Sequence, residues 1–284
     1  MKIAEKITLG SLKALASLPL AILYSLSDVA FLILFHIIGY RRKVVKQNLV
    51  SSFPEKTPAE INKIEKEFYH YLCDQIVETL KLLSISDKTL AKRVKVENYE
   101  EVNNSLRAGT NAVLLLGHYG NWEWVQEITR YFVPGTHMVS IYHPLNNKLW
   151  NDIFNRVRSR WGADILPMKQ APKFLLNKAN QPWVCGFIAD AYTWYKNSDN
   201  CIPFLNHDTW FIYGPEEIGR KLKADFFYLE MKREKRGHYK IIFSKLQPRD
   251  MQLPFPYTRE FWKKFEENIR NNPPYWLWSH KRWK

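Results

Sequence analysis

The sequence predicts an α/β fold, with a mostly parallel, mixed sheet flanked by helices and an N-terminal membrane-associated helical segment. Two observations predict it. From residue 94 onward, short apolar runs alternate with helical stretches, which is typical of a parallel sheet covered on both faces. Before that point, residues 11–40 form the most apolar stretch of the chain. We therefore expect a hydrophobic membrane segment at residues 1–40 and one catalytic domain at residues 41–284.

The composition limits the classes of partner. The chain has 284 residues and a formal net charge of +14, and such a charge suits nucleic acid, an anionic membrane surface or an acidic protein. Its three cysteines, Cys73, Cys185 and Cys201, are widely spaced and form no C-x-x-C pair. This spacing argues against a disulfide framework and against a zinc site, so we expect a reducing compartment.

The N-terminal segment consists of two apolar blocks, Ala14–Leu26 and Val29–Ile38, separated by Ser27 and Asp28. A spanning helix needs about 20 apolar residues, so the whole segment is just long enough to span. Asp28 would be costly near the membrane centre, however. The segment could instead lie in the interface, enter and return, or form a buried hairpin of core helices.

Basic residues follow the apolar segment directly, at Arg41, Arg42, Lys43 and Lys46. Positive charge beside an apolar segment stays on the cytoplasmic side and attracts anionic head groups. We therefore expect residues 41–284 on the cytoplasmic face of the inner (plasma) membrane.

A long amphipathic helix is predicted to begin at Pro58. Thr57 and Glu60 have the spacing of a capping box, with proline at the first helical position. The apolar residues that follow, up to Leu83, recur every three or four positions, which indicates one face packed on a core. We expect this helix to be structural.

The remaining elements follow from periodicity. We predict buried strands at 112–116, 138–142, 183–188, 226–231 and 239–243, and helices near 121–131, 147–161, 171–179, 215–223 and 258–270.

The best candidate for chemistry follows the strand at 112–116. His118 stands where ligands bind in open α/β sheets, and Asn121 is a good N-cap for the next helix. On one helix, His118 and Glu123 would point apart, so they can meet only if Gly117 and Gly120 bend the chain. The alternative is that the glutamate complements the helix dipole and the histidine is simply exposed.

If Glu123 does fold back, the pair could perform general base catalysis. A neutral imidazole takes a proton from a hydroxyl, and a carboxylate on the other ring nitrogen fixes the tautomer. The hydroxyl then attacks a thioester directly. The sequence contains no G-x-S-x-G, P-loop, G-x-G-x-x-G or H-E-x-x-H motif that would indicate another chemistry or a metal.

Several blocks of this chain resemble, in order, those of the bacterial late acyltransferases of lipid A assembly. The central block reads G-H-Y-G-N-W-E at residues 117–123, within that family's H-x4-[DE] motif. The other blocks are Arg42 with Asn48-Leu49 and Phe53-Pro54, Tyr142-His143-Pro144 with Asn147 and residues 155–160, Ile188-Ala189-Asp190, Pro203-Phe204 with Gly214, and residues 274–284.

The resemblance implies an inner-membrane enzyme with a glycerolipid-acyltransferase-like fold, whose residues 41–284 are the acyltransferase domain. It implies an acyl-carrier-protein thioester as donor, with no cofactor or metal, and a hydroxyl of a lipid A precursor as acceptor. By this resemblance His118 is the base and Glu123 its partner. Arg158 is a basic position that could bind the oxyanion or a phosphate. Asp190 is either a site residue or a turn carboxylate, and Asn121 is a further candidate for binding the substrate or the oxyanion.

Two alternatives remain open. The same fold could acylate another lipid, such as an amino-acid lipid or a lysophospholipid. A non-catalytic, basic, membrane-tethered binding protein would also explain the charge. The intact block at 117–123 argues against this second alternative, and we expect no nucleic-acid partner.

Two further segments have more than one interpretation. The basic stretch from Arg220 to Arg249 is either a solvated face or a dock for acidic acyl carrier protein. The C-terminal tryptophans, Trp276, Trp278 and Trp283, either anchor the chain at a membrane or close the core.

Overall fold

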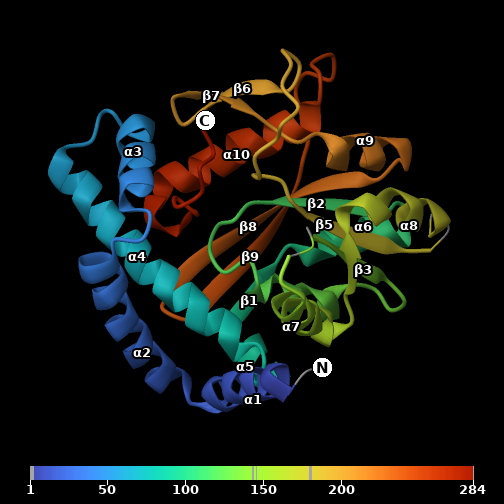
Figure 1. The fold of residues 1–284 in the computed structure, drawn as a ribbon. Helices are drawn as coiled ribbons and strands as arrows, with labels where there is room; N and C mark the ends of the chain where they lie inside the picture. The colour runs from blue at the N-terminus through green and yellow to red at the C-terminus, as the bar shows by residue number, and fades with distance from the viewer. Residues whose placement is uncertain (1–2, 143, 145, 179–180, 284) are drawn as a thin grey trace.

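The computed structural model describes residues 3–142, 144, 146–178 and 181–283, and a seven-stranded sheet lies at its centre (Figure 1). The strand order is β1-β9-β8-β2-β5-β3-β4, and every neighbouring pair is parallel except β8 with β9. This mixed, mostly parallel sheet confirms the predicted fold class. The strands are β1 (Val94–Glu97), β2 (Ala112–Leu116), β3 (His137–Tyr142), β4 (Asp164–Pro167), β5 (Trp183–Ile188), β8 (Asp225–Lys235) and β9 (His238–Lys245).

The five predicted strands are all present, but four short strands were not predicted. These are β1 and β4 at the two edges of the main sheet, and β6 (Cys201–Phe204) and β7 (His207–Trp210), which form a separate antiparallel pair. Each has only 4 residues, too few for periodicity to distinguish a strand from a loop.

Side chains of the central strand β2 point alternately into two hydrophobic cores. Val113 and Leu115 belong to one core, which Phe261 and Phe265 of α10 cover. Leu114 belongs to the other, beside the helices that precede β2. Burial on both faces explains why β2 is a continuous apolar run.

Helices cover both faces of the sheet (Figure 1). The predicted helix near 121–131 is a 3₁₀ helix, η2 (Trp124–Tyr131), and the others are α-helical. They are α3 (Arg42–Ser52), α5 (Asp87–Ala91), α6 (Tyr99–Arg107), α7 (Lys148–Arg158), α8 (Ala171–Asn177), α9 (Gly214–Lys221) and α10 (Pro256–Asn271); further 3₁₀ turns are η3 (Ser159–Trp161), η4 (Met168–Gln170) and η5 (Pro273–Tyr275).

The capping box predicts the start of α4 (Pro58–Lys81) correctly. The backbone N–H of Thr57 donates to Glu60 Oε2 at 2.8 Å, and the N–H of Glu60 donates to Thr57 Oγ1 at 3.3 Å. Ile61, Ile64 and Phe68 are buried in the core, as the apolar stripe predicts.

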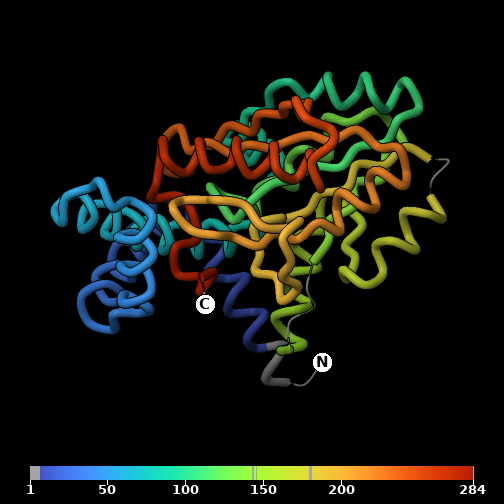
Figure 2. Tube along the Cα trace, turned by 90° about the horizontal axis from the view of Figure 1, so that it is seen from above, coloured from blue at the N-terminus to red at the C-terminus, as the bar shows by residue number. Residues whose placement is uncertain are grey.

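The N-terminal segment forms α1 (Ile3–Ser17), α2 (Leu20–Leu32) and a π-helical turn, η1 (Ile33–Ile38). By length and composition, the continuous helix Leu20–Ile38 could cross a membrane. Figure 1 shows α2 beside α4 at one edge of the molecule, and Figure 2 shows the blue N-terminal helices from above. Most residues of this helix are at least partly exposed, which does not suit a buried hairpin of core helices.

The C-terminal tryptophans close the core. Trp276 and Trp278 are buried, and Trp283 packs against the same cluster. The segment also pairs with the turn after β2, because the N–H of Leu277 donates to the carbonyl of His118 at 3.1 Å. Residues at the end of the chain therefore help to shape the turn that carries His118.

Candidate active site

The register of two neighbouring strands brings His118 and Asp190 together. In the parallel pair β2–β5, Leu116 lies opposite Ile188, and His118 and Asp190 each follow two residues later. The carboxyl ends of parallel strands meet at one edge of the sheet, where ligands bind. Both sequence blocks therefore belong to one site.

Asp190 holds the imidazole of His118 through both carboxylate oxygens. Its Oδ1 lies 2.7 Å from Nδ1 of His118, and its Oδ2 accepts the backbone N–H of His118 at 3.0 Å. Oδ2 also accepts the indole N–H of Trp276 at 2.8 Å. An ionised carboxylate only accepts hydrogen bonds, so in the neutral ring of His118 Nδ1 carries the proton and Nε2 carries the lone pair.

The electrostatics agree with this assignment. Burial alone would raise the pKa of Asp190, but the charge and hydrogen bond of His118 and the indole of Trp276 outweigh it and lower the pKa to about 2. Partial burial lowers the pKa of His118, yet the charge and hydrogen bond of Asp190 raise it above its ordinary value. The two shifts describe one tightly coupled pair.

Arg282 supports Asp190 from the other side. Its Nη1 donates to the backbone carbonyl of Asp190, and its Nη2 donates to that of Trp210 at 3.2 Å. The guanidinium also lies over the Trp262 ring, 4.6 Å from its centroid. Burial lowers the pKa of Arg282 to about 10, against the effect of the Asp190 carboxylate. Arg282 thus fixes the backbone at Asp190 and adds positive charge nearby.

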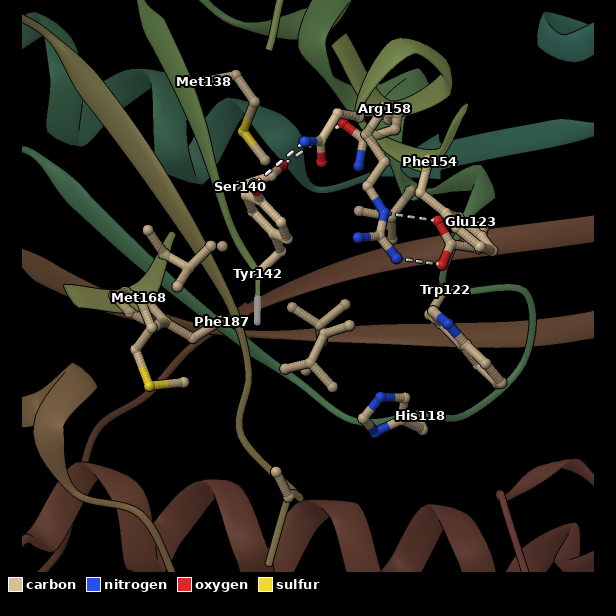
Figure 3. A pocket seen from close by; sticks show the side chains of 18 of the residues that line it. His118, Trp122, Glu123, Met138, Ser140, Tyr142, Phe154, Arg158, Met168 and Phe187 are labelled. Atoms are coloured by element: carbon tan, nitrogen blue, oxygen red, sulfur yellow. Dashed lines mark hydrogen bonds and ion pairs between the residues drawn. The ribbon is translucent and has the colours of Figure 1, made fainter. Parts of the chain in front are cut away.

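Glu123 pairs with Arg158, which differs from the expectation that its carboxylate would hold the ring of His118. Arg158 Nε donates to Glu123 Oε2 at 2.9 Å, and Nη2 donates to Oε1 at 2.6 Å. This bidentate pair is largely buried, with 7% of the Glu123 side chain and 21% of the Arg158 side chain exposed. In Figure 3 the Trp122 ring stands between this pair and His118, and it packs edge-on against the imidazole at 5.3 Å.

The bend between His118 and Glu123 is present, but it points the carboxylate to α7. Gly120 has φ +59°, and a side chain there would meet Met231. A Cβ on Gly117 would lie 2.1 Å from the Phe265 ring, so the chain passes too close to α10 for any larger residue. Gly117 and Gly120 therefore bend the chain as expected, but Glu123 pairs with Arg158 and His118 pairs with Asp190.

Asn121 is buried beneath the turn and anchors it to α4. Its Nδ2 donates to Glu78 Oε2 at 2.6 Å, and its Oδ1 accepts from Gln75 Nε2 and from the N–H of Trp124, both at 3.2 Å. The last bond satisfies the N–H of the first residue of η2, but the N-cap position is Glu123 and not Asn121, because η2 begins only at Trp124. With its amide used in this way, Asn121 is a positioning residue rather than one that lines the cavity.

A cavity of about 340 Å³ opens beside His118 (Figure 3). The histidine and the charged residues of its lining, His118, Glu123 and Arg158, lie on one side, and uncharged polar residues such as Gln126 and Ser140 line it elsewhere. Most of the remaining wall is apolar and comes from β2, β3, β5, α7 and η4; it includes Leu116, Met138, Ile141, Phe154, Met168 and Phe187. An apolar cavity with a few convergent polar groups at one end suits an extended apolar chain with a reactive polar head.

Much of the basic stretch Arg220–Arg249 is paired within the chain. Arg233 and Arg236 bind the buried Asp74, and Lys245 binds Asp225. His143, from the second block of the resemblance, lies outside the described residues.

The comparison with family models shows the family to which the chain belongs. The model of the family described as bacterial lipid A biosynthesis acyltransferase matches residues 3–284. A search of the curated proteins finds no match. The matched range includes the N-terminal helices, both strand ends of the site and the C-terminal segment, so the chain belongs to the bacterial lipid A biosynthesis acyltransferase family.

Proposed function

We propose that this protein transfers an acyl chain from an acyl-carrier-protein thioester to a hydroxyl of a lipid A precursor, at the cytoplasmic face of the inner membrane. The observation that supports this most is the His118–Asp190 pair, 2.7 Å apart, at the polar end of an apolar cavity. Membership of the family supplies the class of reaction and a lipid A-type substrate.

In this proposal His118 is the general base. Its Nδ1 is bound to Asp190, and its Nε2 makes no hydrogen bond within the described residues. Nε2 takes the proton of the acceptor hydroxyl while that oxygen bonds to the thioester carbon. When the carbon–sulfur bond breaks, the imidazolium returns the proton to the leaving thiolate. Asp190 stabilises the imidazolium between these steps.

The Glu123–Arg158 pair provides positive charge close to the reacting carbonyl. Two nitrogens of Arg158 are held by Glu123, which fixes the plane of the guanidinium. Nη1 makes no hydrogen bond to the described part of the chain, so it is left to bind the oxyanion or an acceptor phosphate. Glu123 therefore positions Arg158, and through it the substrate. The apolar wall would hold the acyl chain of the donor.

The test is mass spectrometry of a lipid A precursor incubated with detergent-solubilised protein and acyl-carrier-protein thioesters of several chain lengths. The proposal predicts a mass gain of one acyl chain that is lost in His118→Ala. If no donor acylated this precursor but a lysophospholipid or an amino-acid lipid gained an acyl chain, that other lipid would be the acceptor. A mass gain that persists in His118→Ala would refute the role of His118 as general base.

A further inference from the structure

The helix Leu20–Ile38 has two different long faces. Its buried residues, Leu20, Leu23, Ser27, Phe31 and Phe35, recur every three or four positions and face the protein. An outer stripe with the same spacing is apolar and between 42% and 78% exposed; it consists of Ile22, Leu26, Val29, Ile33 and Ile37. One side of this helix is therefore fixed to the domain along its length, and the other lacks a partner among the described residues.

The contacts with α4 follow the whole helix in antiparallel order. At the start, Lys81 Nζ donates to the carbonyls of Ala16 and Leu18, both at 2.8 Å. In the middle, Ser27 Oγ donates to Asp74 at 2.8 Å.

The far end of the helix is held in the same way. The Tyr69 hydroxyl donates to the carbonyl of Tyr40, and Arg42 Nε donates to Glu65 at 2.9 Å. Residues before, within and after the apolar stretch are thus all attached to the same helix, α4.

An ion pair also ties the middle of the helix to the sheet. Arg236, in the turn between β8 and β9, contacts Asp28 at 2.6 Å and the fully buried Asp74 at 2.6 Å. His70 Nε2 lies 3.0 Å from the same Asp28 oxygen. A helix crossing the membrane would place Asp28 in hydrocarbon and would either break these contacts or draw α4 and the hairpin in with it.

We infer that Leu20–Ile38 lies flat in one leaflet of the membrane, with both ends on the same side. Its length of about 28 Å would suffice to cross the hydrocarbon core, so length does not decide the matter. The contacts decide it, because crossing would put Ala16 and Tyr40 on opposite sides while α4 binds both. The outer stripe then packs against the apolar part of the membrane interface.

The charge beside the stripe indicates anionic lipid. Arg41, Lys43 and Lys46 follow the helix directly and are exposed, and the chain has a net charge of +14. Basic residues beside an apolar helix face are attracted to anionic head groups.

Topology is tested with two matched cysteine variants on either side of the helix, Lys13→Cys and Lys46→Cys, both at exposed lysines. Cys201→Ser serves as the background, since Cys73 and Cys185 are buried. A membrane-impermeant maleimide is applied to spheroplasts and to inside-out vesicles, with labelling in detergent as the reference. We expect both cysteines to react in inside-out vesicles and neither in spheroplasts. Labelling of the two from opposite sides would overturn the inference.

Depth is tested with an environment-sensitive fluorophore on Ile22→Cys, Val29→Cys or Ile37→Cys in the same background. Vesicles of phosphatidylethanolamine with phosphatidylglycerol are compared with vesicles of phosphatidylcholine alone. We expect equal blue shifts and equal quenching by lipid-borne quenchers at the three positions, with stronger binding to the anionic vesicles. Deep burial of position 29 with shallow ends, or no shift at any position, would contradict a flat orientation.

Discussion

Asp190→Asn replaces one carboxylate oxygen at His118 with an NH₂ group and keeps the shape of the side chain. Two N–H donors, from the His118 backbone and the Trp276 indole, point at Oδ2. The amide oxygen must therefore stay at that position, and the NH₂ group takes the place of Oδ1, facing Nδ1 of His118. Nδ1 then has to accept, which moves the ring proton to Nε2, the nitrogen that should take the acceptor's proton.

The expected loss is large because the histidine is then in the wrong tautomer. The same change in a His–Asp pair of a serine protease lowers kcat about 10⁴-fold, and general base catalysis as a whole is worth about 10²-fold to 10⁴-fold. We expect kcat to fall by about 10³-fold to 10⁴-fold, or roughly 4–5 kcal/mol of transition-state stabilisation.

The pH dependence changes as well. In the wild type His118 must be neutral, so activity rises with pH through a pKa that Asp190 raises above 6.5. Without that charge, partial burial lowers the pKa, and the acid limb of the variant moves to lower pH. The variant also loses the stability that the wild type gains because folding lowers the pKa of Asp190 from 3.8 to about 2. This contribution, about 2 kcal/mol, is present above pH 3.8 and disappears as the pH falls through about 2.

The assay is the initial rate of acyl transfer against pH, with urea unfolding alongside. Asp164→Asn is the matched control, since Asp164 contacts Nδ1 of His137 at 3.0 Å on the surface, away from the cavity. It should leave kcat and the acid limb unchanged. If Asp190→Asn kept a tenth or more of the wild-type kcat with the same acid limb, the assignment of Asp190 would be refuted.

Three further changes test the surrounding site. Glu123→Gln should lower activity and destabilise the fold by about 1–3 kcal/mol, because it leaves the Arg158 guanidinium partly unpaired; adding Arg158→Met should restore stability in urea unfolding but not activity. Gly186→Val adds a side chain on the cavity wall and should shift donor preference to shorter acyl chains, measured by competition between thioesters; an unchanged preference would place the acyl chain elsewhere. Gly117→Ala should destabilise the protein by about 1–3 kcal/mol through its clash with Phe265, and Phe265→Leu in the same chain should recover part of the midpoint.

The sequence predicts the elements with strong local signals. The capping box at Thr57 and Glu60 predicts the start of α4, and the apolar runs predict β2 and β5 to the residue. These elements depend on neighbours in sequence, which pattern analysis can read. The edge strands β1 and β4 and the pair β6–β7 depend on pairing partners far along the chain, so their short sequences carry no comparable signal.

The structure brings four of the five expected site residues to one region, but it pairs them differently from the expectation and leaves Asn121 outside the cavity lining. His118, Glu123, Arg158 and Asp190 all lie in the same region, yet the partners differ from the expectation that Glu123 holds His118. Spacing within one motif cannot show which carboxylate a ring nitrogen meets when the second comes from another strand. Knowing the register of β2 with β5 would have been enough, because both residues lie two positions beyond paired strand ends.

Trp276 and Arg282 were missed as site residues. Both come from the C-terminal segment, which was expected either to anchor a membrane or to close the core. Their contacts with Asp190 join residues more than eighty positions apart, and nothing local in the sequence indicates them. In the sequence, the signal for these two residues was the resemblance of residues 274–284 to the lipid A acyltransferases.

The site of protonation on the His118 ring shows whether Asp190 or Glu123 orients the base. We would record ¹⁵N NMR spectra of histidine-labelled protein against pH and assign His118 by its loss in His118→Ala. Above the pKa of His118, we expect a protonated Nδ1 and an unprotonated Nε2, with the opposite tautomer in Asp190→Asn and no change in Glu123→Gln. A proton on Nε2 of the neutral wild-type ring, or a tautomer that depends on Glu123 instead of Asp190, would contradict it.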